Sequence, residues 1–589
     1  MSRKFGIMLI ILSLLPLALY LIAQPNYQNV STTYLSNDDK VILLNYAYDV
    51  IDNYFHASDS SVKIKKNIHN SDFSYDNVFI TVICNGKLRA CYGGTVPVGT
   101  ENRIFRDVQD NVLRCMNDTR YGGVLTEKES LNVMVVFTFL YNRTVLASND
   151  LQYIEQNIEL GVHAIEVDNG GHTAFFKESV PISSNYDLEY TLERLCIKAG
   201  LDNDSWKDNE TKIYKYDTLT FVGNRENTIV DLYRYNILVD VDTISNKMIL
   251  DSISSGQNWF LKNVDSETHL LEYMYYPSED TYASSTNHVR QLGSLWAITE
   301  LDLFLRNNVS HDLIVDTLDY YLTFKNTTKD YAFLTIDNDS KLAYNAFMIL
   351  ILLNTPDYPN RDLLLHQFAN GVLAMQNIDG SYETYITSDV NTGVDYYPGE
   401  AMLALMKLYQ STRDDRYIKS VEKAVPYYRS YWRNTKTTAF VPWQSQVYRL
   451  LYQETGDDEL VKFVFEMNDW LIDNYQIQND VYPDKIGGFP KDSPRNSASS
   501  YLEGINAAYA MAVAVHDQPH IEKYYHSLRI GARFILQTQF TTNNSFYLEN
   551  PWRAIGGFKE SLIQNTLRLD YTQHAVLALI QTYENNIFS

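Results

Sequence analysis

Cysteine and basic side chains are both scarce in this 589-residue chain, and each shortage excludes a class of function. There are only four cysteines, none of them after Cys196, and their spacing does not fit a metal site. Lysine and arginine number 49 against 72 aspartates and glutamates, which gives a net charge of −23. Because binding to phosphate backbones needs clustered basic residues and no basic stripe occurs, nucleic acid is not expected as a partner.

Motifs for metals and cofactors are also absent. The chain has no H-E-x-x-H, EF-hand loop or C-x-x-C pair, and no P-loop or dinucleotide-binding glycine motif. We therefore expect neither a cofactor nor a metal. Tyrosine, by contrast, is abundant, with 46 residues. Its apolar ring and polar tip suit clefts that hold sugars, although codon bias in an Asn-, Ile- and Lys-rich chain explains the number equally well.

A single long apolar run stands near the N-terminus. Residues 6–23 are uncharged, follow the basic pair Arg3-Lys4, and are long enough to span a bilayer or to serve as a secretory signal. Since no clean A-x-A cleavage site follows, we expect residues 1–24 to be an uncleaved anchor with the rest of the chain extracytoplasmic. Cleavage and secretion are the alternative. Nine N-x-S/T triplets agree with export and a glycoprotein.

Strand and helix patterns alternate from about residue 38 to residue 221, which predicts an α+β domain. Residues 77–94, "NVFITVICNGKLRACYGG", have the pattern of two strands joined by an Asn-Gly turn. Residues 131–142, "LNVMVVFTFLYN", are typical of a buried strand. Residues 187–201, "DLEYTLERLCIKAGL", predict an amphipathic helix that ends at Gly200.

Three stretches of this domain resemble the AMMECR family in sequence and in order. "LRACYG" at residues 88–93 resembles the family motif L-R-G-C-I-G, with Ala90 and Tyr92 as departures. "LGVHAIEVDNGGHTAFF" and "LERLCIKAGLDNDSWKDNETKIYKYDT" resemble the later motifs, with Ala164 in place of a glycine. The family's activity is not settled. The resemblance implies that five residues belong to the family's motifs: Arg89, Cys91, Gly93, His163 and Glu166. Of these, His163 and Glu166 would be acid–base partners in a shared cleft.

Cys91 has two interpretations. The cation of Arg89 nearby would favour a reactive thiolate, and the glycines after it would let a ligand approach the backbone. Alternatively, Cys91 is a small buried residue of a strand or one half of a disulfide with Cys84.

Helices separated by aromatic loops repeat from about residue 239 to residue 589. We find six units of outer helix, loop and inner helix, which predicts an all-α (α/α)6 toroid; an open solenoid, usually with shorter and more regular units, is the alternative. The loops "LAMQNIDGSYETYI" and "GGF" resemble those of carbohydrate-active toroids such as glucuronyl epimerases and unsaturated-uronyl hydrolases. No acidic motif of terpene cyclases is present. The resemblance implies a fold more than a chemistry.

Polar and aromatic residues gather where each inner helix begins, at the end of a toroid that binds ligands. Acidic residues there also complement the helix dipole, but Arg290, Gln444 and His574 gain nothing from it, which favours a site. The catalytic candidates are Glu400, Glu503, Asp570, His574, Tyr397 and Tyr571. The substrate-binding candidates are Arg290, Asn287, Tyr396, Trp443, Gln444 and Tyr501.

Several functions fit these residues. In a carbohydrate hydrolase, two of the three carboxylates would act as acid and base. In a lyase or epimerase, Tyr397 or Tyr571 with His574 would move a proton at the carbon beside a uronate carboxylate, which Arg290 would hold. A surface protein that binds glycan or peptide without catalysis, and thiol chemistry at Cys91, are the alternatives. The expected partners are therefore a glycan or another small polar ligand, and the membrane through the N-terminal helix.

Overall fold

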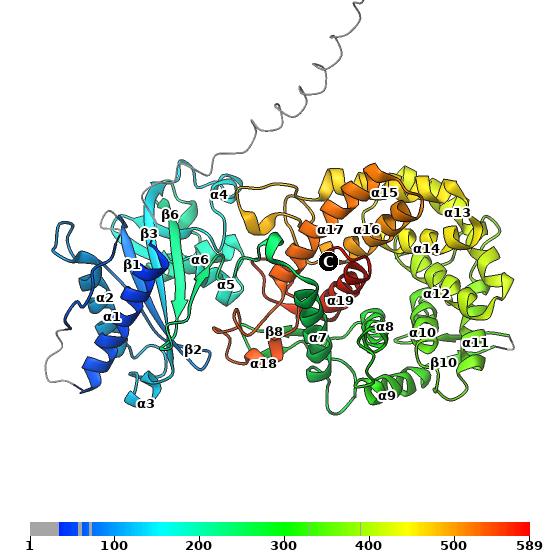
Figure 1. Ribbon diagram of the computed structural model, residues 1–589, viewed down its shortest axis with the longest axis horizontal. Helices are drawn as coiled ribbons and strands as arrows, with labels where there is room; N and C mark the ends of the chain where they lie inside the picture. The colour runs from blue at the N-terminus through cyan, green and yellow to red at the C-terminus, as the bar shows by residue number, and fades with distance from the viewer. Residues whose placement is uncertain (1–34, 57–61, 70–72, 329, 389) are drawn as a thin grey trace, which may run out of the picture.

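The computed structural model describes residues 35–56, 62–69, 73–328, 330–388 and 390–589, which form two domains side by side (Figure 1). The anchor expected at residues 1–24 lies outside the described residues. Among the residues that are described, no helix is both long and apolar enough to cross a membrane.

A seven-stranded antiparallel sheet forms the centre of the first domain. Its strand order is β2-β1-β3-β6-β4-β5, with β7 also paired to β6. The strands are β1 (Asn77–Cys84), β2 (Lys87–Gly93), β3 (Val133–Val145), β4 (Ala164–Asn169), β5 (His172–Phe176), β6 (Lys212–Gly223) and β7 (Ile229–Leu232). The helices around it are α1 (Asn37–His56), α2 (Arg103–Met116), α3 (Glu127–Ser130), α4 (Leu151–Asn157), α5 (Ser179–Ser184), α6 (Leu188–Lys198) and the short η1 (Ser205–Lys207). The predicted α+β class is confirmed.

Side chains of the central strands alternate between two covered faces, as the pleat of a strand requires. Val135 and Phe221 lie in the core beneath α1 and α2. Their sequence neighbours Val136 and Val222 lie on the opposite face, where they pack against Phe546 of the second domain. The second domain, together with Ile182 of α5, thus covers this face of the sheet.

The second domain consists of six helical hairpins. The outer helices are α7 (Asn246–Lys262), α9 (His311–Leu322), α11 (Arg361–Ala374), α13 (Asp415–Thr435), α15 (Asp458–Tyr475) and α17 (Gln518–Thr538). The inner helices are α8 (His288–Leu305), α10 (Leu342–Leu353), α12 (Tyr397–Thr412), α14 (Phe440–Thr455), α16 (Ser497–Ala514) and α19 (Leu569–Glu584). Short elements lie between them: η2 (Val241–Thr243), β8 (Met274–Tyr276), β9 (Thr281–Tyr282), β10 (Lys325–Thr327), β11 (Ala332–Leu334), η3 (Pro483–Lys485), α18 (Pro551–Ala554) and β12 (Leu567–Arg568).

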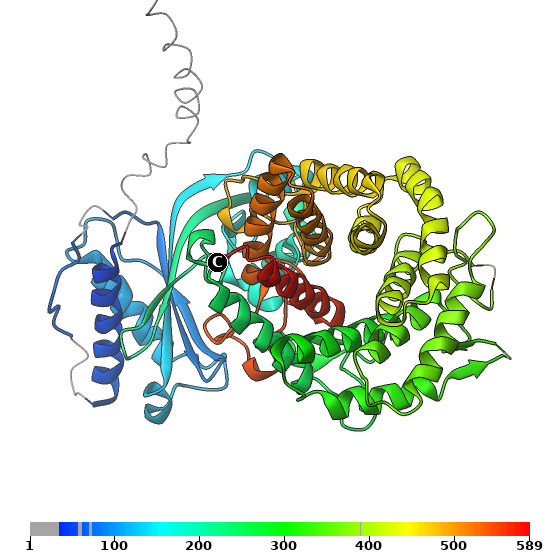
Figure 2. The same cartoon turned by 45° about the vertical axis from the view of Figure 1, so that its right-hand side comes forward.

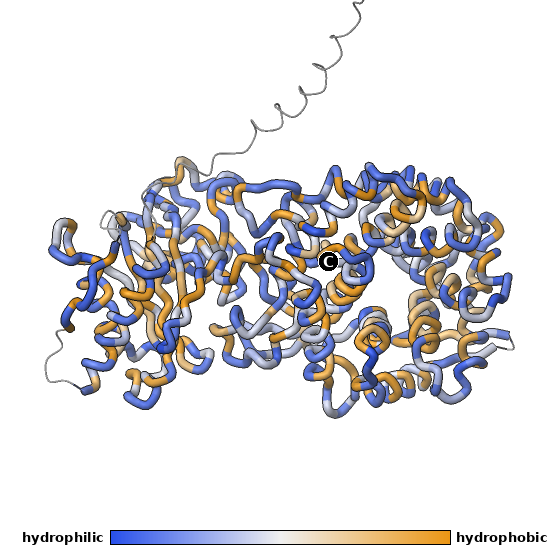
Figure 3. Tube along the Cα trace, in the orientation of Figure 1, coloured by the Kyte–Doolittle hydropathy of each residue, from blue (hydrophilic) through white to orange (hydrophobic). Residues whose placement is uncertain are grey.

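The six inner helices form a closed ring. Each packs against the next, and α19 packs against both α16 and α8, so the last hairpin meets the first (Figure 2). Hydrophobic segments concentrate in the sheet and in these inner helices (Figure 3). In α10, Leu342 to Leu352 are all buried, as expected for a helix with neighbours on every side. Because the ends of the repeat meet, the open-solenoid alternative is wrong.

The two GGF loops are built alike and explain why glycine recurs there. Gly487 and Gly556 have positive φ angles of 87° and 98°. A Cβ atom on Gly487 would lie 1.9 Å from the carbonyl oxygen of Ile530 in α17, and one on Gly556 would lie 2.1 Å from that of Ser255 in α7. Each loop therefore packs directly on the next outer helix around the ring, and only glycine allows that approach.

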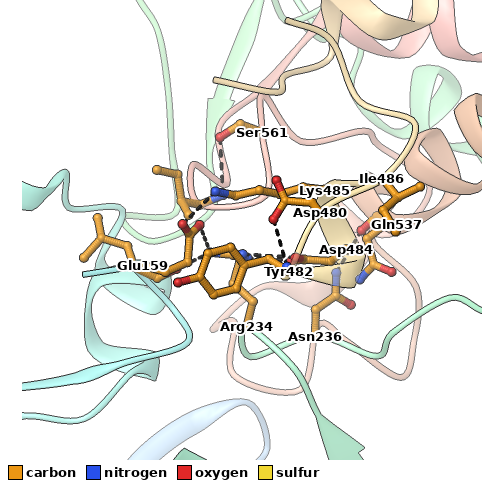
Figure 4. Close-up of polar contacts among 12 residues, drawn as sticks. Glu159, Arg234, Asn236, Asp480, Tyr482, Asp484, Lys485, Ile486, Gln537 and Ser561 are labelled. Carbon is orange, nitrogen blue, oxygen red and sulfur yellow. Dashed lines mark hydrogen bonds and ion pairs between the residues drawn. The ribbon is translucent and has the colours of Figure 1, made fainter. Parts of the chain in front are cut away.

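A buried arginine joins the two domains. Arg234, which follows β7, donates from Nε to Asp484 Oδ2 at 2.5 Å and from Nη1 to Glu159 Oε1 at 2.7 Å (Figure 4). Lys485 also binds Glu159, with 2.6 Å between Nζ and Oε2. Gly161 makes room for this arrangement, since a Cβ atom there would lie 2.3 Å from Cγ of Arg234. At this point of the interface, one buried cation thus lies between carboxylates of both domains.

Replacing Arg234 with methionine is expected to lower the free energy of unfolding by about 3–5 kcal/mol, because Asp484 would be left buried and without its cation. Urea denaturation measures this. Arg433→Met is a matched control, because Arg433 pairs with Glu466 at the surface and is expected to contribute about 1 kcal/mol or less. An equal loss in the two variants would contradict the role given to Arg234.

Candidate active site

A cavity of about 550 Å³ opens at the end of the ring where the inner helices begin, and we call it the front cavity. Most of the residues predicted for the site lie in its wall, although the predicted Glu503 and Gln444 do not. The predicted residues that line it are Asn287, Arg290, Tyr396, Tyr397, Glu400, Trp443, Tyr501, Asp570, Tyr571 and His574. The first two turns of five inner helices, or the residue just before them, thus place polar and aromatic groups around one space.

His574 and Glu503 form a hydrogen-bonded pair. His574 Nδ1 lies 2.6 Å from Oε1 of Glu503, which is buried behind the wall with 1% of its surface exposed. No partner for Nε2 is found among the described residues, so this nitrogen is available to a ligand. Burial alone would lower the pKa of His574, but the charge and hydrogen bond of Glu503, with a further contribution from Asp570, raise the pKa above its usual value.

Glu400 is a buried carboxyl without a counter-charge. It lies in the first turn of α12 and is 4% exposed, and its Oε2 atom has no hydrogen-bond partner within the described part of the chain. Burial raises its pKa to about 8. At neutral pH the group is therefore mostly a protonated acid that faces the front cavity, where it can donate a proton.

Two arginines converge on Asp570. Arg290 Nε lies 3.1 Å from Oδ2 of Asp570, and Arg568 donates to both carboxylate oxygens, at 2.5 Å and 2.8 Å. Arg290 also donates to the hydroxyl of Tyr273 at 2.6 Å. Two cations share one carboxylate, so one positive charge remains at the rim of the cavity and can bind an oxyanion or a polarised carbonyl oxygen.

Aromatic rings form much of the remaining wall. Trp443 lies edge-on to His574 with 6.1 Å between ring centres, and Tyr396 is 46% exposed at the mouth. Burial raises the pKa of both Tyr397 and Tyr571 well above the usual value. Both phenols are therefore hydrogen-bond donors at neutral pH, and their part in moving a proton together with His574 stays a prediction.

Gln444 and Glu503 lie behind the wall. Both polar atoms of the Gln444 amide are buried without a hydrogen-bond partner among the described residues. Some lining residues were not predicted. Arg495, Asn496 and Glu560 come from loops and have no repeat position, and Ser497 and Ser500 lie at the start of α16. Their common signal is a position a few residues after a GGF motif, as for Glu560 after Phe558.

The guanidinium of Arg89, in the AMMECR-type motif, does not bind Cys91, although the sequence suggested that its charge would act on that thiol. Arg89 donates from Nε to Glu129 at 2.9 Å and also donates to the backbone carbonyl of Tyr121. Its charge is thus neutralised by Glu129. Gly93 is not open to a ligand either, since a Cβ atom there would lie 2.3 Å from the ring of Phe79.

Cys91 is a free, half-buried thiol, as all four cysteines are free, and the disulfide with Cys84 is not formed. Cys84 lies in the core beneath α1 and α2. The Cys91 sulfur instead accepts a hydrogen bond from the hydroxyl of Thr81 at 3.3 Å, and Lys177 donates to the same hydroxyl at 2.7 Å. The cation nearest in this network is therefore Lys177, one hydroxyl away.

His163 and Glu166 have structural partners. Nδ1 of His163 accepts from the backbone of Glu159 at 2.9 Å, and burial, followed by the charge of Lys215, lowers the pKa of His163 to about 4. Glu166 accepts from Arg143 at 2.9 Å. Within the described residues no hydrogen bond or ion pair joins these side chains to Cys91, and the shared cleft stays a prediction. Nor is any group of three or more potential metal ligands present there.

Residues 44–221 match the AMMECR1 family, so the first domain is an AMMECR1 domain. A protein of Pyrobaculum arsenaticum is 25% identical over 152 residues, which are 26% of this chain and 68% of the relative. The predicted resemblance of this region is thus confirmed.

The second domain is similar in structure to solved carbohydrate-active enzymes. Cellobiose 2-epimerase from Bacillus thermoamylovorans has a TM-score of 0.44 and 11% identity, covering 58% of this chain and 98% of the epimerase. An unsaturated glucuronyl hydrolase specific for heparin has a TM-score of 0.39 and 11% identity, covering 57% of this chain and 97% of the hydrolase. At this level of similarity, neither neighbour's substrate extends to this chain.

Proposed function

We propose that the ring domain is a carbohydrate-active enzyme that moves a proton on a sugar carbon, as epimerases, isomerases and lyases do, with His574 as the acid–base group. The observation that supports this most directly is the 2.6 Å contact between His574 Nδ1 and Glu503, which leaves Nε2 available at the wall of the front cavity. A buried carboxylate that orients a histidine and stabilises its charged form is a recurring acid–base arrangement.

The geometry favours this reaction over hydrolysis by two carboxylates. Of the three candidate carboxylates, Glu503 is bonded to His574, and Asp570 is bound by two arginines. Only Glu400 is free to exchange a proton with a ligand. A hydrolase of the two-carboxylate type needs a second available carboxylate on the other side of the bond. The remaining carboxylate of the wall, Glu560, comes from a loop, whereas His574 already has the orienting carboxylate that an acid–base histidine needs.

The roles of the other residues follow from their charges. When His574 removes a proton from a carbon next to a carbonyl or carboxylate, negative charge develops on that group's oxygen. Arg290 and Arg568 would stabilise this charge, because their combined charge exceeds that of Asp570. Glu400, protonated at neutral pH, would donate a hydrogen bond or a proton to the sugar. Trp443 and Tyr396 would pack against the faces of the ring.

Deuterium exchange tests the proposal. The full-length protein would be incubated in D₂O with reducing aldoses, with uronates and with polyuronides, in which elimination would create a double bond. The products would be followed by proton NMR. We expect loss of a carbon-bound proton signal, with or without epimerisation or elimination. Release of sugar by hydrolysis with no exchange at carbon would overturn the proposal, as would binding of every sugar without turnover.

The pH profile gives a further prediction, with Glu503→Gln as the variant. His574 must be neutral to accept a proton, so kcat/KM should rise as pH passes the raised pKa of His574. At higher pH, kcat/KM should fall near pH 8, because Glu400 ionises and no longer donates a proton. Removing the Glu503 charge lowers the pKa of His574, so the acid limb should move to lower pH, with a maximum reduced by about tenfold or more. An acid limb that does not move would contradict the pairing.

Export of the protein is also proposed, with residues 1–24 as its signal or anchor. All eight sequon asparagines in the described part of the chain are exposed: Asn117, Asn142, Asn203, Asn209, Asn308, Asn326, Asn338 and Asn543. A glycan is bulky and needs surface positions. Protein from its native cells should lose mass on treatment with a peptide N-glycosidase, and an unchanged mass would count against passage through a glycosylating compartment.

Thiol chemistry at Cys91 is a second candidate function, because Thr81 connects its sulfur to Lys177. An iodoacetamide label should react at Cys91 before the three buried cysteines, and Lys177→Met should slow that reaction. Equal labelling rates in the two proteins would remove this candidate.

A further inference from the structure

A second cavity lies at the opposite end of the ring, where the inner helices end, and we call it the rear cavity. It has a volume of about 450 Å³ and is lined by residues of α8, α12, α14, α16 and α19. Both cavities share these five helices, the front one near their first turns and the rear one near their last. A volume of this size accommodates a ligand as large as a monosaccharide derivative.

Arg449 is the distinctive residue of the rear cavity. Its guanidinium makes no hydrogen bond and no close ion pair with any residue that the structure describes. Burial lowers its pKa, and Glu584, also in the cavity wall, acts on it only through charge. Arginine in a partly buried position normally has a carboxylate or carbonyl partner. The five donor N–H groups of Arg449 are instead available to a ligand in the cavity.

The second cation of the cavity is already paired. Lys407 Nζ lies 2.5 Å from Oε1 of Glu300, which also accepts from the indole of Trp296 at 2.9 Å. Glu584 also lines the wall, but no hydrogen bond or close ion pair joins it to Arg449 in the described part of the chain. Arg449 is therefore the cation of this cavity that has no direct partner.

The wall beside Arg449 is partly apolar. Trp296 and Phe304 of α8 line the same space, as do amide side chains of α14, α16 and α19. This combination suits a ligand with one oxyanion group and a body that has both apolar faces and hydroxyls.

We propose that the rear cavity is a second ligand site, which binds a small organic oxyanion of monosaccharide size, a carboxylate or a phosphate ester, through Arg449. This goes beyond the proposed catalytic function, because no atom of the front cavity takes part and the rear site needs no turnover to be observed.

Two contacts connect the rear site to His574. Gln446, in the rear wall, donates from Nε2 to Glu503 Oε2 at 3.4 Å, and the other oxygen of Glu503 binds His574. Trp296, also in the rear wall, lies 6.0 Å from Trp443 of the front cavity, measured between ring centres. The two sites are thus separated by a single layer of side chains, so a rear ligand would contact the residues that support the catalytic pair.

Binding measured by calorimetry tests the proposal. The probes are glucose 6-phosphate, glucuronate and neutral glucose, and the protein is the full-length chain with Arg290→Gln, which removes an anion-binding residue from the front cavity. We expect this variant to bind the two anionic probes better than glucose. Adding Arg449→Gln should weaken both by about tenfold or more, since a charge-assisted bidentate contact is lost. Arg449→Lys should be intermediate.

The matched control is Arg433→Gln, which removes an arginine that pairs with Glu466 at the exposed surface. It should leave affinity for all probes unchanged, and thermal melting should show that each variant is folded. Equal affinity with and without Arg449, or no binding of either anion to the Arg290→Gln protein at about 100-fold molar excess, would overturn the proposal. Neither outcome would bear on the proton-transfer activity, which the deuterium assay measures independently.

Discussion

Replacing His574 with glutamine should lower kcat/KM for the sugar substrate by about 10²–10⁴-fold, because the group that removes the proton is lost while the shape of the side chain is roughly kept. Glutamine can still donate a hydrogen bond to Glu503, so Glu503 is not left as an unpaired buried charge. The variant should therefore fold and bind sugar with little change in affinity, and the loss should appear in kcat.

The measurement is the rate of deuterium incorporation by the variant and the parent protein under the same conditions. His520→Gln is the matched control, because His520 pairs with Asp517 on the outer helix α17, away from both cavities. It should retain full activity. If His574→Gln kept more than about a tenth of the activity, His574 could not be the acid–base group.

Replacing Glu400 with glutamine should change activity and stability in opposite directions. The proton that Glu400 donates is lost, so kcat should fall by about 100-fold. The folded-state pKa of Glu400 is about 8, against an ordinary value of 4.5. As pH rises through this window the unfolded chain releases the proton and the folded protein does not, so the wild type loses stability. At pH 7 the loss is about 3 kcal/mol, and glutamine avoids it.

Urea denaturation at pH 5 and at pH 7.5 tests the stability part of this prediction. The difference in free energy of unfolding between Glu400→Gln and the parent should be small at the lower pH and grow in favour of the variant at the higher pH. Glu466→Gln is the control, since Glu466 is at the surface of α15, and it should change stability by about 1 kcal/mol or less. If Glu400 served only in packing, replacing it with glutamine would not raise stability while lowering activity.

The ring could be predicted from the sequence because its pattern is local. The inner helices are rich in apolar residues, most of all α10, and each is preceded by an outer helix with one apolar face. The positions of the site residues followed from the same repeat, since the start of every inner helix lies at the same end of the ring. Lining residues such as Glu560 lie in loops, whose course depends on contacts that no repeat specifies.

Pairings between distant residues could not be predicted. Glu503 and His574 are on different hairpins, and three carboxylates looked equivalent until one was found bonded to the histidine and another to two arginines. Arg89 shows the same limit in the first domain. Its spacing from Cys91 suggested contact along one strand, but Glu129, held by the capping box of α3, attracts the arginine instead.

The closure of the ring by α19 has a consequence for how the protein is made. Asp570, Tyr571 and His574 all lie on this helix, which is the last of the twelve to leave the ribosome. Until it emerges, α8 and α16 expose the apolar surfaces that α19 will cover, and the front cavity lacks both His574 and Asp570. The wall of the front cavity and the last contact of the ring are therefore completed in the same step.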